Sequence, residues 1–105
     1  MRAHRHVDHF NQAVRSGDWK TFADTFTEDA LMVFTNVPAG PYAGRSEILR
    51  AYEEHPPDDT MSITTVEAVD ETTDRVRFAW DDAGPGTMLL RWRDDQVELL
   101  EITFG

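Results

Sequence analysis

The sequence contains no cysteine, no long apolar run and no excess of basic residues. The lack of cysteine excludes disulfide bonds, thiolate nucleophiles and zinc sites built on thiolates. No apolar stretch approaches the ~18 residues of a membrane-spanning helix. The first ten residues, MRAHRHVDHF, lack the apolar core of a signal peptide. These absences predict a cytoplasmic protein with no membrane partner.

Positive charge is scarce, because ten lysines and arginines stand against 20 acidic residues and leave a net charge of −10. A nucleic-acid-binding protein needs a basic patch, so we expect no nucleic-acid partner. The negative charge gathers in residues 54–105, which hold thirteen acids and four bases. Such a charge favours solubility, and a cationic partner is the alternative interpretation.

Motifs for common cofactors are also missing. No glycine-rich phosphate loop, nucleophile elbow or dinucleotide fingerprint occurs. Of the three histidines near the start, only His6 and His9 are three residues apart and share a helical face. Two imidazoles without a third ligand make a poor zinc site. We therefore expect no metal and no cofactor.

The first half of the sequence has the pattern of three helices and one strand. Apolar residues recur at three- and four-residue steps, which is the period of a helix. Val and Phe in a short apolar run favour a strand, and clustered proline and glycine favour a loop. The expected elements are helices over 3–16, from Trp19 to Phe26 and from Arg45 or Ser46 to Pro56, a strand over 31–35 and a loop over 36–44.

The second half alternates apolar and polar residues between short turns, which predicts strands over 61–69, 75–81, 87–93 and 97–104. Short turns join consecutive strands into hairpins. Helices followed by hairpins predict an α+β fold, with N-terminal helices packed in the concave face of a curved, mostly antiparallel sheet. The length of 105 residues fits a single domain over 1–105. We expect the helices to fill the concave side incompletely and to leave a cone-shaped pocket.

Three segments carry a family resemblance: GDWKTFADTFTEDALMVF, then GPYAGRSEILRAY, then the final ITFG. Together they resemble the nuclear transport factor 2-like superfamily, in its SnoaL-like polyketide cyclase and ketosteroid isomerase branches. The resemblance covers nearly the whole chain and implies a cystatin-like cone with an apolar cavity. It implies no single activity, since such domains include isomerases, dehydratases, cyclases, hydrolases and members without chemistry.

The resemblance also allows the catalytic positions of ketosteroid isomerases to be compared. The tyrosine donor, the aspartate base and the protonated aspartate of those enzymes match Phe10, a position near Phe34, and a position near Met88. All three are apolar here, so the catalytic carboxylates and tyrosine of that mechanism are absent from the matching positions. The pocket aspartate of SnoaL-like cyclases has no match either. Whether the protein is an enzyme stays open.

The candidate ligand-binding residues are apolar side chains expected on the inner face and two polar ones in the rim loop: Phe10, Phe34, Asn36, Tyr42, Phe78, Trp80, Met88, Trp92 and Phe104. Aromatic side chains suit the walls of a site for a flat ligand, although they suit a plain core equally well. His6, one turn before Phe10, is the candidate catalytic residue, expected at the mouth of the pocket. Glu98 has the inward parity of Leu100, but its place beside a turn favours solvent.

Three functions follow as hypotheses. The first is a SnoaL-like domain that binds a small apolar or aromatic molecule in the pocket. The second is a small acid/base enzyme of the isomerase, dehydratase, cyclase or hydrolase type, in which His6 would give a pH–rate limb near ~6.5. The third is a non-catalytic module that forms a homodimer through the outer sheet face, where leucines lie among Arg91 and Glu101 and intersubunit Arg–Glu contacts are expected.

Overall fold

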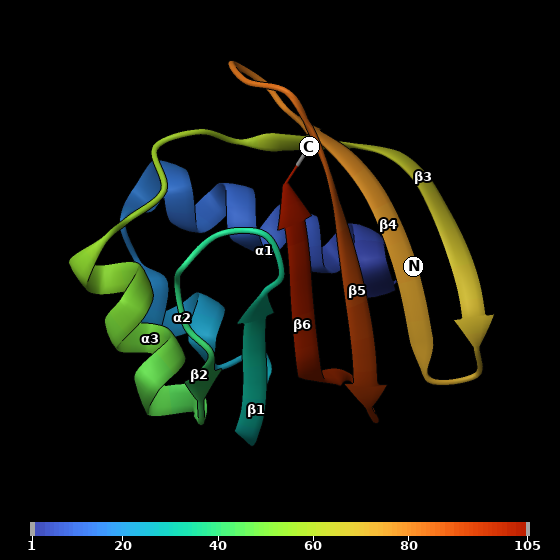
Figure 1. The fold of residues 1–105 in the computed structure, drawn as a ribbon. Coiled ribbons are helices and arrows are strands. Elements are labelled where there is room, and N and C mark those ends of the chain that lie inside the picture. Colours follow the sequence, from blue (N-terminus) through green and yellow to red (C-terminus); the bar gives the residue numbers. More distant parts are fainter. Residues whose placement is uncertain (1, 105) are drawn as a thin grey trace.

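The computed structural model describes residues 2–104, which form three helices and six strands (Figure 1). In chain order these are α1 (Arg2–Ser16), α2 (Trp19–Ala23), β1 (Phe26–Phe34), β2 (Tyr42–Ala43), α3 (Arg45–Glu54), β3 (Met61–Asp70), β4 (Thr73–Trp80), β5 (Pro85–Arg93) and β6 (Gln96–Phe104). None of the described helices combines the length and the apolar character needed to cross a lipid bilayer.

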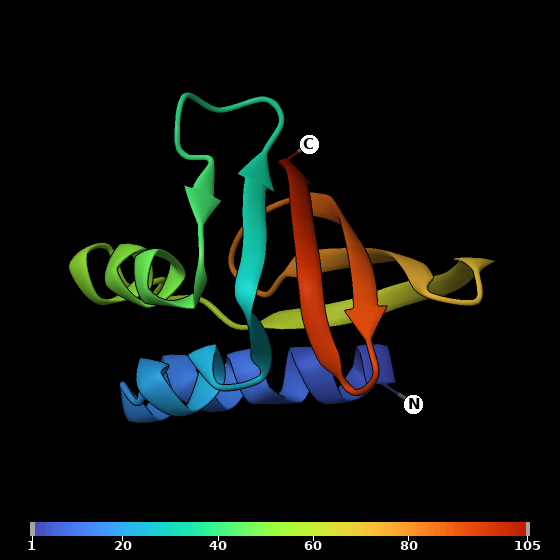
Figure 2. The same ribbon diagram turned by 90° about the horizontal axis from the view of Figure 1, so that it is seen from below.

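All six strands belong to one sheet, in the order β2-β1-β6-β5-β4-β3. Neighbouring strands are antiparallel except β1 and β6, which run parallel. The strands at the two ends of the sheet point in different directions, so the sheet curls around the helices (Figure 2). The expected fold class, an α+β cone with helices in the concave face of a mostly antiparallel sheet, is confirmed.

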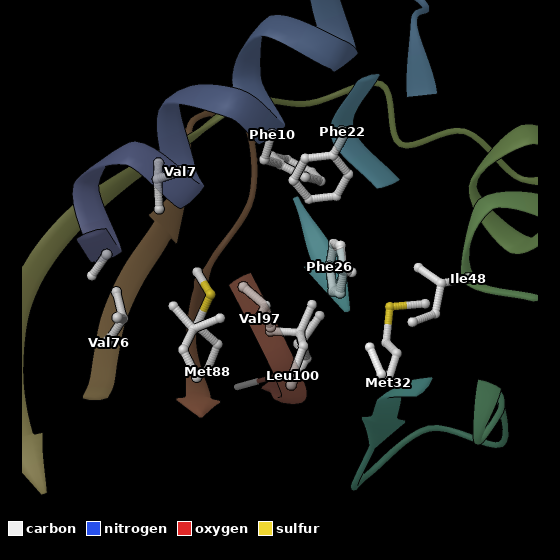
Figure 3. Packing of buried hydrophobic residues seen from close by; sticks show 14 of the residues in the cluster. Val7, Phe10, Phe22, Phe26, Met32, Ile48, Val76, Met88, Val97 and Leu100 are labelled. Carbon is white, nitrogen blue, oxygen red and sulfur yellow. The ribbon is translucent and has the colours of Figure 1, made fainter. Parts of the chain in front are cut away.

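The first helix covers the concave face because its apolar residues share one side. Ala3, Val7, Phe10 and Ala13 are all buried, and Figure 3 shows Val7 and Phe10 directed into the core above the strands. Gly17 ends the helix with φ at +77°, a conformation that glycine adopts without strain. Helical periodicity in the sequence therefore identified both the element and its buried face.

The second helix is shorter than predicted. It ends at Ala23, and Phe26 opens β1, so the expected helix to Phe26 and the closing turn after it are wrong. The reason is a distant partner: Phe26 pairs with Val97 of β6, and the Val97 N–H donates to the Thr25 carbonyl at 3.0 Å. Strand pairing across the sheet therefore overrides the local helical spacing.

Two other boundaries differ from the sequence prediction. Residues 42–43 lie in the expected loop but form β2, which pairs with Leu31 and Met32 of β1. The expected turn at Gly84–Gly86 is shorter, because Pro85 and Gly86 already belong to β5. Both differences extend the sheet at the end where the cavity opens.

A bulge in β6 decides where Glu98 points. Val97 pairs with Trp92 and Leu99 pairs with Arg91, so Glu98 has no pairing partner on β5. The extra residue reverses the alternation, which puts Val97 in the core and Glu98 on the convex face. The solvent side, favoured for Glu98 over its inward parity, is therefore the one observed.

The convex face of the sheet carries no helix of the described chain (Figure 2). Leu89 and Leu99 are half-buried there. The carboxylate of Glu98 lies 3.0 Å from Arg91 Nε and 3.5 Å from Arg93 Nε, so Arg–Glu pairs form within one chain. A homodimer through this face stays a prediction.

Candidate functional site

The concave side of the sheet holds a cavity of about 350 Å³. Residues from α1, α3, all six strands and two loops line it: His6, Phe10, Met32, Phe34, Ala39, Tyr42, Ala51, Tyr52, His55, Pro57, Met61, Phe78, Trp80, Met88, Leu100, Ile102 and Phe104. The cavity reaches the surface between the loop after β1 and the segment after α3, where Ala39 and His55 are exposed. A buried apolar cavity of about 150 Å³ holds benzene, so this one has room for a larger ring compound.

Four half-buried aromatic rings form a continuous wall in the outer part of the cavity. Phe34 and Phe104 are nearly parallel, with ring centroids 5.9 Å apart. Trp80 stacks on Phe104 at 6.3 Å, and Tyr42 meets Phe34 edge-on at 6.3 Å. β1, β2, β4 and β6 each contribute one ring, so the wall exists only when these strands come together in the curled sheet.

The structure brings most of the predicted site residues together. Eight of them line the cavity: His6, Phe10, Phe34, Tyr42, Phe78, Trp80, Met88 and Phe104. Their role in binding a ligand stays a prediction.

Asn36 and Trp92 do not line this cavity. The Asn36 side chain is held against the backbone of Phe104, whose N–H donates to Asn36 Oδ1 at 3.0 Å. Trp92 is directed inward as predicted, but it lies toward the N-terminal end of α1. Its Nε1 donates to Asp74 Oδ2 at 3.1 Å, and the Arg2 guanidinium lies 5.3 Å from its ring centroid. Both residues therefore have structural partners of their own.

His6 is buried, so its predicted position at the mouth of the pocket is wrong. Only 4% of the residue is exposed, and the rings of Phe22, Phe26 and Trp92 surround it at centroid distances of 5.3 to 6.5 Å. Its Nδ1 has no hydrogen-bond partner among the described residues. Burial, and to a lesser extent the charge of His9, lowers the pKa of His6 from 6.5 to about 3. His6 is therefore a neutral imidazole at neutral pH, and the pH limb expected near ~6.5 would not arise from it.

Tyr52 is the most informative lining residue that is absent from the candidate residues predicted from the sequence. It lies one turn after Ile48 on the buried face of α3 and stacks on Trp19, with centroids 4.8 Å apart and planes 4° from parallel. Burial raises the pKa of its hydroxyl, which keeps the group protonated and able to donate a hydrogen bond. The four-residue spacing of Ile48 and Tyr52 is typical of one helix face, but no sequence signal shows that the cavity reaches Tyr52.

Comparison with known protein families identifies the family of this chain. A family model for the SnoaL-like domain matches residues 7–99. The chain belongs to the SnoaL-like domain family. At the level of sequence alone, none of the curated proteins matches this SnoaL-like domain.

Solved structures share the fold of this SnoaL-like domain. A provisionally named isomerase from Bacillus subtilis has a TM-score of 0.77 at 17% identity, over 99% of this chain and 86% of that one. A nuclear transport factor 2-like protein from Anabaena variabilis has a TM-score of 0.72 at 21% identity, over 99% and 87%. A protein with a ketosteroid isomerase-like fold from Catenulispora acidiphila, solved with trimethylamine, has a TM-score of 0.75 at 14% identity, over 95% and 85%. At these identities the likeness shows the fold alone.

The chemistry available in this SnoaL-like domain follows from its lining. Among residues 2–104, no carboxylate, lysine or arginine lines the cavity. Its polar groups are those of Tyr42, Tyr52, His6 and His55. Within the same part of the chain, no three potential metal ligands lie close enough together to hold an ion. The arrangement favours binding of an apolar molecule with few hydrogen bonds.

Proposed function

We propose that this SnoaL-like domain binds a small, largely apolar or aromatic molecule in the cavity. The observation that carries the proposal is a cavity of about 350 Å³, open to the surface and lined by seven aromatic rings. An apolar ring that enters it leaves water and contacts these side chains, and such burial stabilises a complex by roughly 25 cal/mol per Å² of apolar surface. We also propose a cytoplasmic location and a homodimer, both of which are predicted from the sequence alone.

Acid/base catalysis is the alternative function. Provisional names of solved neighbours include isomerase, ketosteroid isomerase and polyketide cyclase. The neutral, buried His6 would be a weak base, since efficient general bases have pKa values near the working pH. The resemblance matches the catalytic tyrosine and the two aspartates of ketosteroid isomerases to positions at or beside Phe10, Phe34 and Met88. These three lining residues are apolar and cannot transfer a proton. The geometry therefore supports binding better than it supports proton transfer.

A thermal-shift screen with flat ketones, phenols and polyketide-like aromatics tests the proposal. A ligand at a hundred times its Kd adds about 2.7 kcal/mol to the free energy of unfolding. For a domain of this size, such a gain raises Tm by roughly 10 °C or more. We expect at least one compound class to produce a shift of this order.

Two leucine substitutions locate the bound compound. Ala51 of α3 lines the cavity, so Ala51→Leu extends a side chain into the space that the ligand needs. Ala68 is exposed on β3 and is not among the residues that line this cavity, which makes Ala68→Leu the matched control. Ala51→Leu should abolish the shift, and Ala68→Leu should retain it. If no compound stabilises the unaltered protein, or if Ala51→Leu responds as the unaltered protein does, the proposal is wrong.

A further inference from the structure

The apolar cavity adjoins an acidic cleft, and the two share a wall. The cleft is lined by Pro57, Asp58, Asp59, Trp80, Asp82 and Ala83, so Trp80 and Pro57 belong to both spaces. A ligand that extends outward past Trp80 therefore leaves an aromatic environment and meets carboxylates directly.

The carboxylates of Asp58 and Asp82 are available to such a ligand. Both residues are exposed, and neither side chain has a hydrogen-bond or ion-pair partner in the part of the chain that the structure describes. Asp59 is already engaged, because its Oδ2 accepts from the Asp82 N–H at 3.0 Å. No lysine or arginine of the described chain lines the cleft. Neighbouring Asp81 does not line the cleft. Hydrogen bonds from Thr60 and Ser62, and to a lesser extent the charge of Arg15, lower the pKa of Asp81.

The aromatic wall suits the same kind of ligand. The face of an indole, phenol or phenyl ring attracts a cation within about 6 Å of its centroid, and tryptophan is the strongest of the three. Trp80 is half-buried and stacks on Phe104, so its ring is held in place without being covered completely. A quaternary ammonium group has no N–H to donate to water and is less strongly hydrated than a primary one, which makes it suited to a site that is part aromatic and part solvated.

We propose that the ligand is an organic cation, with an apolar body in the cavity and a quaternary ammonium group beside Trp80, facing Asp58 and Asp82. The inference rests on the proposed function and specifies its ligand class. A negatively charged compound would place its charge against the same carboxylates. The net charge of −10 adds a long-range attraction for cations.

A matched pair of compounds tests the sign of the charge. (4-Hydroxyphenyl)trimethylammonium and 4-tert-butylphenol have nearly the same shape, and they differ in that a positive nitrogen replaces a carbon. We expect titration calorimetry of the full chain to show that the cation binds about tenfold more tightly, the preference that one aromatic contact and nearby carboxylates provide. Added salt should weaken binding of the cation more than binding of the phenol.

Charge-neutralising variants test the location. The double variant Asp58→Asn, Asp82→Asn should weaken binding of the cation several-fold and leave binding of the phenol unchanged. Asp8 is exposed on α1, lines none of these spaces and has no ion-pair partner among the described residues. Asp8→Asn, the control, should leave the preference intact. Trp80→Leu should remove most of the preference, and the exposed aspartates provide a second test if that variant fails to fold.

The outcomes separate the two proposals. If the phenol binds as tightly as the cation or more tightly, the ligand class is wrong and the apolar binding site stands. If the cation is preferred but the aspartate double variant keeps the full preference, the proposed position of the ammonium group is wrong. If neither compound binds, and no other compound of the thermal-shift screen does, both proposals are wrong.

Discussion

Gly86 is the position where one added methyl group meets the core most directly. Gly86 lies opposite Phe78 across the β4–β5 ladder. A Cβ at residue 86 would lie 2.5 Å from Phe78 Cζ and 3.0 Å from Cε2. Carbon atoms in contact are ordinarily separated by about 3.5 to 4.0 Å. The Phe78 ring, which is 1% exposed, would therefore have to move by roughly 1 Å.

Gly86→Ala should lower the free energy of unfolding by about 1 to 3 kcal/mol, the usual cost of overpacking a core. We expect the lower part of that range, because Phe78 lines the cavity and its ring can move into that space. The same movement would reduce the cavity volume and weaken ligand binding. Urea denaturation followed by circular dichroism measures the change in stability, with an unchanged m-value as the check for two-state unfolding.

The chain provides a matched control and a compensating variant. Gly84 is two residues away, a Cβ there would meet no atom within 4 Å, and Gly84→Ala should change stability by no more than about 0.5 kcal/mol. Phe78→Leu shortens the side chain, so combining it with Gly86→Ala should cost less than the sum of the two single changes. Equal stability of the two alanine variants, or strict additivity in the double variant, would refute the steric argument.

The two remaining predictions concern buried polar groups. The folded-state pKa of His6 is about 3, below the ordinary 6.5, so the unfolded chain binds the proton first and stability falls as pH drops from about 6.5 towards 3. Between pH 7 and pH 5 this loss should be about 2 kcal/mol larger in the unaltered protein than in His6→Leu. If the free energy of unfolding fell by the same amount in both proteins, the prediction would be wrong. Asp74→Ala removes the buried acceptor of Trp92 Nε1 and Arg2 Nε, and urea denaturation should show a loss of about 1 to 3 kcal/mol. Glu67→Ala, which breaks an exposed ion pair, should cost less than about 1 kcal/mol, and a cost equal to that of Asp74→Ala would show that burial is not the cause.

Local patterns in the sequence predicted the helices and hairpins because both depend on nearby residues. Non-local pairing is what the sequence did not reveal. Trp19, Phe22 and Phe26 have helical spacing, yet Phe26 lies in β1 because a strand seventy residues later pairs with it. The same limit explains why β2 and the parallel β1–β6 pair were not anticipated.

For the candidate site, the alternation of apolar and polar residues predicted which face of the sheet a side chain lies on. It did not predict where along the cone that side chain lies. Phe78, Trp80 and Trp92 all point inward, yet only Phe78 and Trp80 reach the cavity. Helical spacing placed His6 on the face of Phe10 but could not reveal how deeply the surrounding rings would bury it. Depth and cavity position depend on the curl of the whole sheet, which no single segment determines.

The position of β6 in the sheet has a consequence for the order in which the protein can fold. β6 is the last of the described strands in sequence order, yet it lies between β1 and β5. On the ribosome, the hairpins of β3 to β5 can form as they emerge, whereas β1 has no long partner until residues 96–104 are available. Contacts between such distant segments slow folding, because a long loop must close before they are made. Assembly of the aromatic wall, which needs β6, is therefore expected only after residues 96–104 have been made, later than the hairpins of β3 to β5.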